Sequence, residues 1–461
     1  MTVKLKTILE NEWEEFKRTS DSEELKRPAV HDNIWKILHC KTLWLGLQVY
    51  QCEDHGEEVR LVPCTCKSRF CPSCGYKANL VWLNQLLARA LPCDHQHLVF
   101  TLTYELRDLT KDNRRLIFNL MSRTLWRTIR QFLKKHKSLD YQPGAVAILH
   151  TFGKGLKWHI HFHVLITAGG LRNGRWVQNE YLNEKYLKQA WKAKLLAGLR
   201  KLYRSGQLVR AFGRYPGQTF EQLLSETYAK DWYVWIDRVK GDGTFAFTYI
   251  GRYAKRACIA QKGIIRYQPG KLVVWKERSK VPVPDICAHR ATPLEFLELL
   301  ITHIPNRYDH QVHYFGLYSS RQKNTFYAKA LKILNRKAAV KKLISTVKLT
   351  WSKLMKWSHD IDPLSCAICG KEMKRVCIIF FNPKHPADRE LLLILINDVA
   401  DIKNISEDGD AGVIIGATFL KNFVDDLPWV HIDIGTTVWS KADKGILTKG
   451  ATGATVRLMM E

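Results

Sequence analysis

The segment KWHIHFHVLIT (157–167) constrains the fold of this chain more than any other part. Successive side chains of a β-strand point to opposite faces of a sheet. One face of this segment is wholly apolar, with Trp158, Ile160, Phe162, Val164 and Ile166. The other face carries three imidazoles, those of His159, His161 and His163. The alternation therefore predicts a strand that covers a core with one face and presents ligands with the other.

Neighbouring segments supply the rest of an antiparallel sheet. HLVFTLT (97–103) alternates in the same way, and GAVAILHT (144–151) leads into the histidine segment through a GKG turn, which predicts a hairpin. Between them, apolar residues recur three or four apart from Ile117 to Phe132 and predict a helix. Five basic residues are expected on its outer face: Arg114, Arg123, Arg127, Arg130 and Lys134. These elements predict the α+β class.

The histidine face points to metal chemistry. His161 and His163 stand two residues apart, so their rings can converge on one divalent ion if both are neutral and held by other partners. A lone histidine is more often simply hydrogen-bonded. Three histidines opposite a clean apolar face favour a ligand site.

A second motif, FTYIGRYAKRACIA (247–260), places Tyr249 and Tyr253 one helical turn apart. Three cations accompany them: Arg252, Lys255 and Arg256. A phenol with a pKa of about 10 is a weak nucleophile at neutral pH, but a divalent ion on a phosphate and nearby cations can help it attack. Without other motifs, such a pair would more often pack into a core.

Charge indicates the partner. The chain has 72 Lys and Arg against 44 Asp and Glu, a formal net charge of +28, which favours a nucleic acid. Basic clusters beside apolar helices, typical of membrane binding, are absent from the sequence, as are a secretory signal and any run of about 20 apolar residues. We therefore expect a cytoplasmic protein with no membrane partner.

Cysteines cluster near the beginning of the chain. A run Cys66-x4-Cys71-x2-Cys74 follows Cys52 and His55, and these five residues predict one structural zinc site. Cys40 and Cys64 are either further ligands or buried thiols. A second pair, Cys366 and Cys369 with Cys377 behind it, is a weaker candidate because only three ligands lie nearby in the sequence.

Composition divides the chain into four parts. We expect a zinc-binding domain at 1–95, a large basic domain at 96–345, a Cys-containing segment at 346–383 and a tail at 384–461. The tail is acidic, with 12 Asp and Glu against 8 Lys and Arg.

Several motifs in one order carry a family resemblance. VFTLT, HIHFH and YIGRY follow the order of the three motifs of HUH rolling-circle initiators. With CKSRFCPSC, LHTFG and VHYFGLYSSR, the chain from about 28 to 380 resembles the two-tyrosine rolling-circle transposases of the insertion-sequence ninety-one family. The family usually has Cys where this chain has His55, and imidazole also binds zinc.

This resemblance implies an antiparallel-sheet HUH endonuclease domain with flanking helices, preceded by a small zinc-binding domain. It implies that His161, His163 and a third side chain, either His150 or His159, hold Mg²⁺ or Mn²⁺ on the scissile phosphate. Tyr249 and Tyr253 would be the nucleophiles, giving a 5′-phosphotyrosine and a free 3′-hydroxyl. The expected partner is single-stranded DNA of element ends and target, and a homo-oligomer is left open.

The end of the chain resembles something else. Residues 398–461, from VADIKNISEDGDAGVIIG to KGATGATVRLM, are similar to the C-terminal end of leucyl aminopeptidases. Those enzymes bind two metals through an upstream region that this sequence lacks, so we expect a fused fragment without peptidase activity. Three alternatives to the transposase remain at this point: a rolling-circle replication initiator, a catalytically dead DNA-binding remnant and an aminopeptidase.

Overall fold

The computed structural model describes residues 4–135, 140–209, 217–237, 247–248, 251, 257–276, 288–337, 364–379, 439–440 and 450–451. The chain divides into two compact units, one of residues 1–40 and 65–365, the other of residues 41–64 and 366–461. The first unit contains both the beginning of the chain and the large sheet.

A five-stranded antiparallel sheet with the order β12-β4-β5-β3-β8 forms the centre of the first unit. Its strands are β3 (His95–Thr101), β4 (Gly144–Phe152), β5 (Trp158–Thr167), β8 (Val234–Asp237) and β12 (Val312–Gly316). The predicted hairpin is confirmed: β4 pairs with β5, and Gly155 in the turn adopts φ 66°. The predicted α+β class is confirmed as well.

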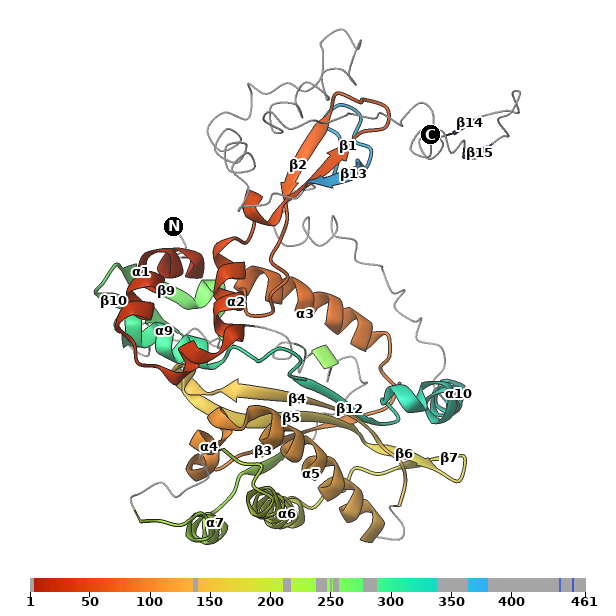
Figure 1. The fold of residues 1–461 in the computed structure, drawn as a ribbon. Helices are drawn as coiled ribbons and strands as arrows, with labels where there is room; N and C mark the ends of the chain where they lie inside the picture. The colour runs from red at the N-terminus through yellow and green to blue at the C-terminus, as the bar shows by residue number, and fades with distance from the viewer. Residues whose placement is uncertain are drawn as a thin grey trace, which may run out of the picture. The chain divides into compact units, whose positions relative to one another are not determined.

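Helices cover the apolar face of this sheet, on one side of it in Figure 1. They are α5 (Arg114–Lys135), α6 (Glu184–Arg204) and α7 (Phe220–Ala229). Ile160, Phe162 and Val164 of β5 are fully buried in the resulting core. The alternation in the sequence therefore identified the covered face correctly.

Helix α3 (Pro72–Leu87) lies on the opposite side of the sheet (Figure 1). Its Trp82 and Leu86 belong to a second core with Val146, Ile148 and Leu165. Because Ile148 pairs with His163 and His150 with His161, these apolar residues share their sheet face with the histidines. This face is thus apolar toward one end and rich in imidazole toward the other.

The beginning of the chain belongs to the same unit. Helices α1 (Leu5–Thr19) and α2 (Pro28–Leu38) are accompanied by α9 (Pro293–Thr302), and Glu12 of α1 accepts a hydrogen bond from the Tyr267 hydroxyl, 2.7 Å away. A three-stranded sheet completes this region: β9 (Ile264–Gln268), β10 (Leu272–Trp275) and β11 (His289–Ala291).

One predicted surface arginine is buried. Arg114 is 3% exposed, and its guanidinium donates to Glu24 and to the Thr302 carbonyl oxygen, at 2.6 and 2.7 Å. It also lies over the Trp158 ring. The spacing of apolar residues along α5 predicted an exposed Arg114 because that pattern describes the helix alone. In the structure, the segment around Glu24, far earlier in the sequence, covers this end of the helix.

The remaining elements of the first unit are short. They are α4 (Arg107–Asp112), α10 (Ala328–Lys337), β6 (Gly169–Arg172) and β7 (Arg175–Gln178). None of the helices that the structure describes combines the length and apolar character needed to cross a membrane.

The second unit contains a three-stranded antiparallel sheet with the order β13-β1-β2. Its strands are β1 (Leu47–Gln51), β2 (Val59–Pro63) and β13 (Lys374–Ile379). A separate pair consists of β14 (Trp439–Ser440) and β15 (Gly450–Ala451).

Candidate active site

Three imidazoles from the central hairpin converge at the histidine-rich end of the sheet. Nε2 of His161 lies 3.1 Å from Nε2 of His163, and ligand nitrogens of His150, His161 and His163 all lie within 4.8 Å of one another. Cross-strand pairing of His150 with His161 brings the third ring to the same face. The described residues therefore present a three-histidine candidate metal site.

Hydrogen bonds define which nitrogen of His161 is available. Its Nδ1 lies 3.1 Å from the His159 carbonyl oxygen, which can only accept, so Nδ1 carries the proton and Nε2 keeps its lone pair. His163 is held in turn: its Nδ1 lies 2.9 Å from Nε2 of His97. Such outer partners orient ligand rings.

His159 is engaged differently. The Arg107 guanidinium donates to its Nδ1 at 2.6 Å, and arginine has no acceptor atom. A neutral His159 therefore has its one lone pair occupied. This contact favours His150 over His159 as the third ligand, the alternative that the sequence left open.

The surroundings keep these rings neutral. Burial lowers the pKa of His161 and His163 well below 6.5, and the nearby His150 lowers it further. Burial also lowers the pKa of His97 and His159 to about 4. Neutral imidazole is the form that binds metals, so the site is prepared for an ion at neutral pH.

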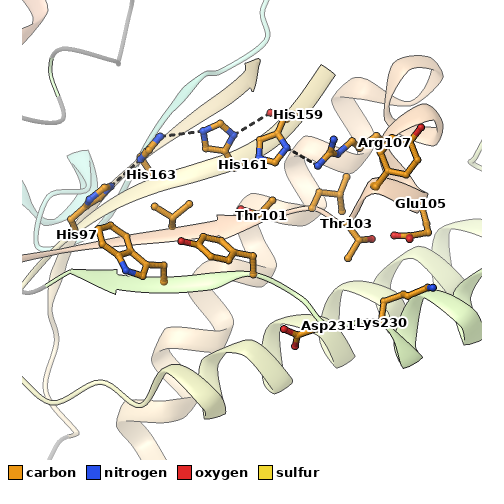
Figure 2. A pocket seen from close by; sticks show the side chains of 15 residues that line it. His97, Thr101, Thr103, Glu105, Arg107, His159, His161, His163, Lys230 and Asp231 are labelled. Carbon is orange, nitrogen blue, oxygen red and sulfur yellow. Dashed lines mark hydrogen bonds between the residues drawn. The ribbon is translucent and has the colours of Figure 1, made fainter. Parts of the chain in front are cut away.

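A pocket of about 740 Å³ opens beside these histidines, over β3, β5 and β8. Figure 2 shows His97, His163, His161, His159 and Arg107 in a hydrogen-bonded row along one wall. The other walls carry aromatic and charged side chains: Tyr104, Glu105, Lys230, Asp231, Tyr233 and Trp235. The pocket thus places flat rings and cations next to the candidate metal site.

The predicted tyrosine motif is only partly described. Tyr249 and Tyr253, with Arg252, Lys255 and Arg256, lie outside the described residues. Two neighbours are placed: Phe247 is fully buried in the core beneath α3, and the Gly251 carbonyl accepts from Asn79 of α3 at 2.7 Å. A Cβ on Gly251 would lie 2.4 Å from Cδ1 of Leu83, so a larger residue here would displace the Leu83 side chain. Phe247 therefore belongs to a core that is on the histidine side of the sheet.

Four cysteines form a buried cluster in the first unit: Cys40, Cys66, Cys71 and Cys74. Sulfur separations are 3.6 Å for Cys40–Cys74, 3.5 Å for Cys66–Cys74 and 3.9 Å for Cys40–Cys71. Four thiolates about 2.3 Å from a tetrahedral zinc would lie about 3.8 Å apart.

The structure places the residues of the predicted zinc site in two groups. Cys52 and His55 lie in the second unit, together with Cys366 and Cys369, whereas Cys66, Cys71 and Cys74 lie in the first. The five predicted residues are therefore divided between two candidate sites. The reason is topological, because the chain leaves the first unit after Cys40 and returns to it at Thr65.

Comparison with protein families identifies the class of protein. The model "Putative transposase" matches residues 144–325, and "Transposase zinc-binding domain" matches residues 8–102. These ranges contain the histidine hairpin and the Cys40 cluster. A third model, "Cytosol aminopeptidase family, catalytic domain", matches residues 385–460.

Individual relatives agree. The chain is 27% identical over 354 residues to the transposase for insertion sequence element IS801 of Pseudomonas savastanoi pv. phaseolicola, covering 74% of this chain and 82% of that one. It is 25% identical over 298 residues to a transposase, y4qJ, of Sinorhizobium fredii, covering 61% and 72%. The chain belongs to the IS91 family of transposases, as its motif order predicted.

The tail has separate relatives. It is 48% identical over 68 residues to a cytosol aminopeptidase of Syntrophobacter fumaroxidans, but this match covers 14% of the chain and 13% of that enzyme. No solved structure matches the chain.

Sequence reasoning missed most of the pocket walls. Arg107, Lys230 and Tyr233 carry no motif of their own and come from two separate segments, around 107 and 230–233. His97 had a signal, because alternation placed it opposite Leu98 on the predicted strand. Its contact with His163 depends on the pairing of β3 with β5.

Proposed function

We propose that this transposase is a metal-dependent HUH endonuclease and strand transferase for single-stranded DNA, acting through a 5′-phosphotyrosine in rolling-circle transposition. The observation that carries the proposal is the convergence of His161 and His163, with His150, on one point beside a pocket lined by aromatic and charged side chains. His161 presents a lone pair there, and the neutral His163 needs only to carry its proton on Nδ1 to do the same.

The spacing of the donors is compatible with an octahedral ion such as Mg²⁺ or Mn²⁺. Octahedral ligands about 2.1 Å from Mg²⁺ lie about 3.0 Å apart, close to the 3.1 Å between Nε2 of His161 and Nε2 of His163. Three imidazoles leave positions for phosphate and water oxygens. When bound, such an ion would polarise the scissile phosphate.

The pocket suits an unpaired strand. Tyr104 and Tyr233 are 60% and 57% exposed, so their rings are accessible for base stacking. Arg107 and Lys230 supply positive charge near the phosphates that a strand would bring. Bases in a duplex are stacked on one another and do not offer their faces in this way.

For the chemical step we assign Tyr249 and Tyr253 as nucleophiles. The phenol oxygen forms a bond to phosphorus as the bond from phosphorus to the 3′ oxygen breaks. Net transfer of the phenol proton leaves a free 3′-hydroxyl and a tyrosine joined to the 5′ phosphate. The phosphodiester energy is kept, so the strand can be rejoined elsewhere without ATP. Arg252, Lys255 and Arg256 would contact the DNA backbone.

We assign a structural role to the Cys40 cluster. Its four buried thiols have the spacing that tetrahedral Zn²⁺ requires and lie within the transposase zinc-binding domain. Cys40, which sequence reasoning left between ligand and buried thiol, is thereby a proposed ligand.

A nicking assay tests the proposal. The purified protein, incubated with a labelled single-stranded element end and Mn²⁺, should leave a denaturation-resistant adduct on the strand 3′ of the cut. His161→Ala with His163→Ala should abolish cleavage and largely retain DNA binding, since basic and aromatic side chains supply binding without the ion. Tyr249→Phe with Tyr253→Phe should form no adduct, because Phe keeps the ring and removes the nucleophile.

Three results would contradict the proposal. Full cleavage by the double Ala variant would remove the metal assignment. Cleavage without an adduct would indicate a hydrolytic nuclease. A wild-type protein that binds element ends and never cleaves them with Mg²⁺ or Mn²⁺ would support the catalytically dead remnant.

A further inference from the structure

Two remote parts of the chain form the second unit. β1 and β2 come from residues 41–64, whereas β13 follows Cys366 and Cys369, far later in the sequence. β13 pairs antiparallel with β1 over its length, from Leu47 opposite Ile379 to Gln51 opposite Lys374. Something must hold these two segments together.

Side-chain packing gives this association little support. All six residues of β13 are exposed, and the buried apolar residues of the described segment, Leu364 and Met373, lie before the strand. Two ion pairs cross between the segments, Lys371 with Asp54 and Lys374 with Glu53. Both are exposed, and exposed pairs stabilise little. Small sheets without a core usually depend on a covalent or metal crosslink.

A candidate crosslink lies where β1 ends and shortly before β13 begins. Cys52 Sγ is 3.6 Å from Cys369 Sγ, and Nδ1 of His55 is 3.8 Å from Cys52 Sγ and 4.0 Å from Cys366 Sγ. Tetrahedral zinc with its usual bond lengths places sulfurs about 3.8 Å apart and sulfur and nitrogen about 3.6 Å apart. A disulfide is excluded, because its sulfurs would lie about 2.0 Å apart.

Both halves of the cluster are tight turns of similar design. In the first, the Cys52 amide donates to the Glu58 carbonyl oxygen, and the Glu58 amide donates to that of His55. In the second, the Cys366 amide donates to the Lys371 carbonyl oxygen, and the Gly370 amide donates to that of Cys366. Gly370 adopts φ 70°, a conformation that favours glycine. Each turn points two ligands, separated by two intervening residues, to one side.

Backbone amides of Cys369 and Ile368 donate toward the Cys366 sulfur, and amide donors of this kind stabilise metal-bound sulfur. Cys377, the third cysteine that the sequence grouped with this pair, is exposed on β13 and does not belong to the four-residue cluster.

We propose that Cys52, His55, Cys366 and Cys369 hold a second structural Zn²⁺, which joins the segment 41–64 to the segment 366–379. This site is independent of the nuclease chemistry. Its ligands from the second half lie beyond both transposase family matches, which end at residues 102 and 325. The zinc-binding part of this transposase is therefore completed only when Cys366 and Cys369 have been made.

Zinc content of the purified full-length chain, measured by native mass spectrometry, tests the proposal. The wild type should carry two zinc ions. Cys366→Ser with Cys369→Ser should carry one, and Cys71→Ser with Cys74→Ser, at the other cluster, should also carry one. The control Cys377→Ser, next to the same turn, should keep two.

Two further measurements test the proposal even if the Cys366→Ser, Cys369→Ser variant does not fold. His55→Cys should keep two zinc ions, because a thiolate replaces the imidazole, whereas His55→Ala should lose one. Alkylation should label Cys52 slowly in the wild type and rapidly in the Cys366→Ser, Cys369→Ser variant. A wild type with one zinc that the Cys366 and Cys369 changes do not remove would overturn the proposal, as would an unchanged Cys52 reactivity.

Discussion

His97 offers a quantitative test of the proposed metal site. It is 2% exposed, and its Nε2 contacts the nitrogen of His163 that faces away from the candidate ion. His97→Phe keeps a flat ring against Trp235, whose ring centroid lies 5.6 Å away, and removes the nitrogen that orients His163. The three histidines nearest the candidate ion are unchanged, so the variant should still bind metal, but more weakly.

The expected loss of metal affinity follows from the loss of the partner that orients His163. One neutral hydrogen bond contributes about 0.5–1.5 kcal/mol to stability. Loss of a partner that orients a metal ligand costs more, about 10–100-fold in metal affinity. At about 1.4 kcal/mol per tenfold, this corresponds to about 1.4–2.8 kcal/mol. The Mn²⁺ concentration for half-maximal nicking should therefore rise about 10–100-fold, with cleavage restored at saturating Mn²⁺.

Manganese titration of single-stranded nicking measures this shift. His313→Phe is the matched control, since His313 pairs with Ala147 on the opposite face of the same sheet and should leave the Mn²⁺ requirement unchanged. A His97→Phe protein with a wild-type melting profile and an unchanged Mn²⁺ requirement would refute the assigned role of the His97–His163 contact. Loss of cleavage at every Mn²⁺ concentration would refute it too.

Three further outcomes are expected. Tyr104→Ala should weaken single-stranded DNA binding by about 1–3 kcal/mol in fluorescence anisotropy, because a stacking surface is lost. The control Tyr308→Ala removes an exposed tyrosine that does not line the pocket and should leave binding unchanged. Equal effects of the two variants would exclude the pocket as the binding surface. Arg114→Leu should destabilise the protein by about 1.5–3 kcal/mol in urea unfolding, because the buried charged hydrogen bond to Glu24 is lost while Arg27 still pairs with Glu24. Lys26→Ala, which breaks an exposed pair, should cost about 0–1 kcal/mol, and similar values for the two variants would contradict the role of the buried pair. Deleting residues 398–461 should leave nicking unchanged, and the intact chain should not release leucine from leucine amides with Mn²⁺ or Zn²⁺, since the aminopeptidase match covers 13% of that enzyme.

The sequence by itself determined the local features of this transposase. Alternation in the histidine segment identified a strand, its covered face and the side on which His161 and His163 lie, because side-chain direction in a strand depends only on position along the chain. The order of the motifs identified the family, because that order is a property of the sequence alone. The assignment of Tyr249 and Tyr253 still rests on the sequence alone.

Only the tertiary structure decided which remote groups meet. His150 and His159 were equivalent candidates until the β4–β5 register brought His150 to the site and Arg107 occupied the lone pair of His159. The proposed zinc ligands depend on the path of the chain. Spacing in sequence cannot show that the chain leaves the first unit after Cys40 and returns to it at Thr65, or that Cys366 lies with Cys52 in the second unit. Ligand geometry is a property of distances in space, and sequence spacing fixes those distances only within one turn or one strand.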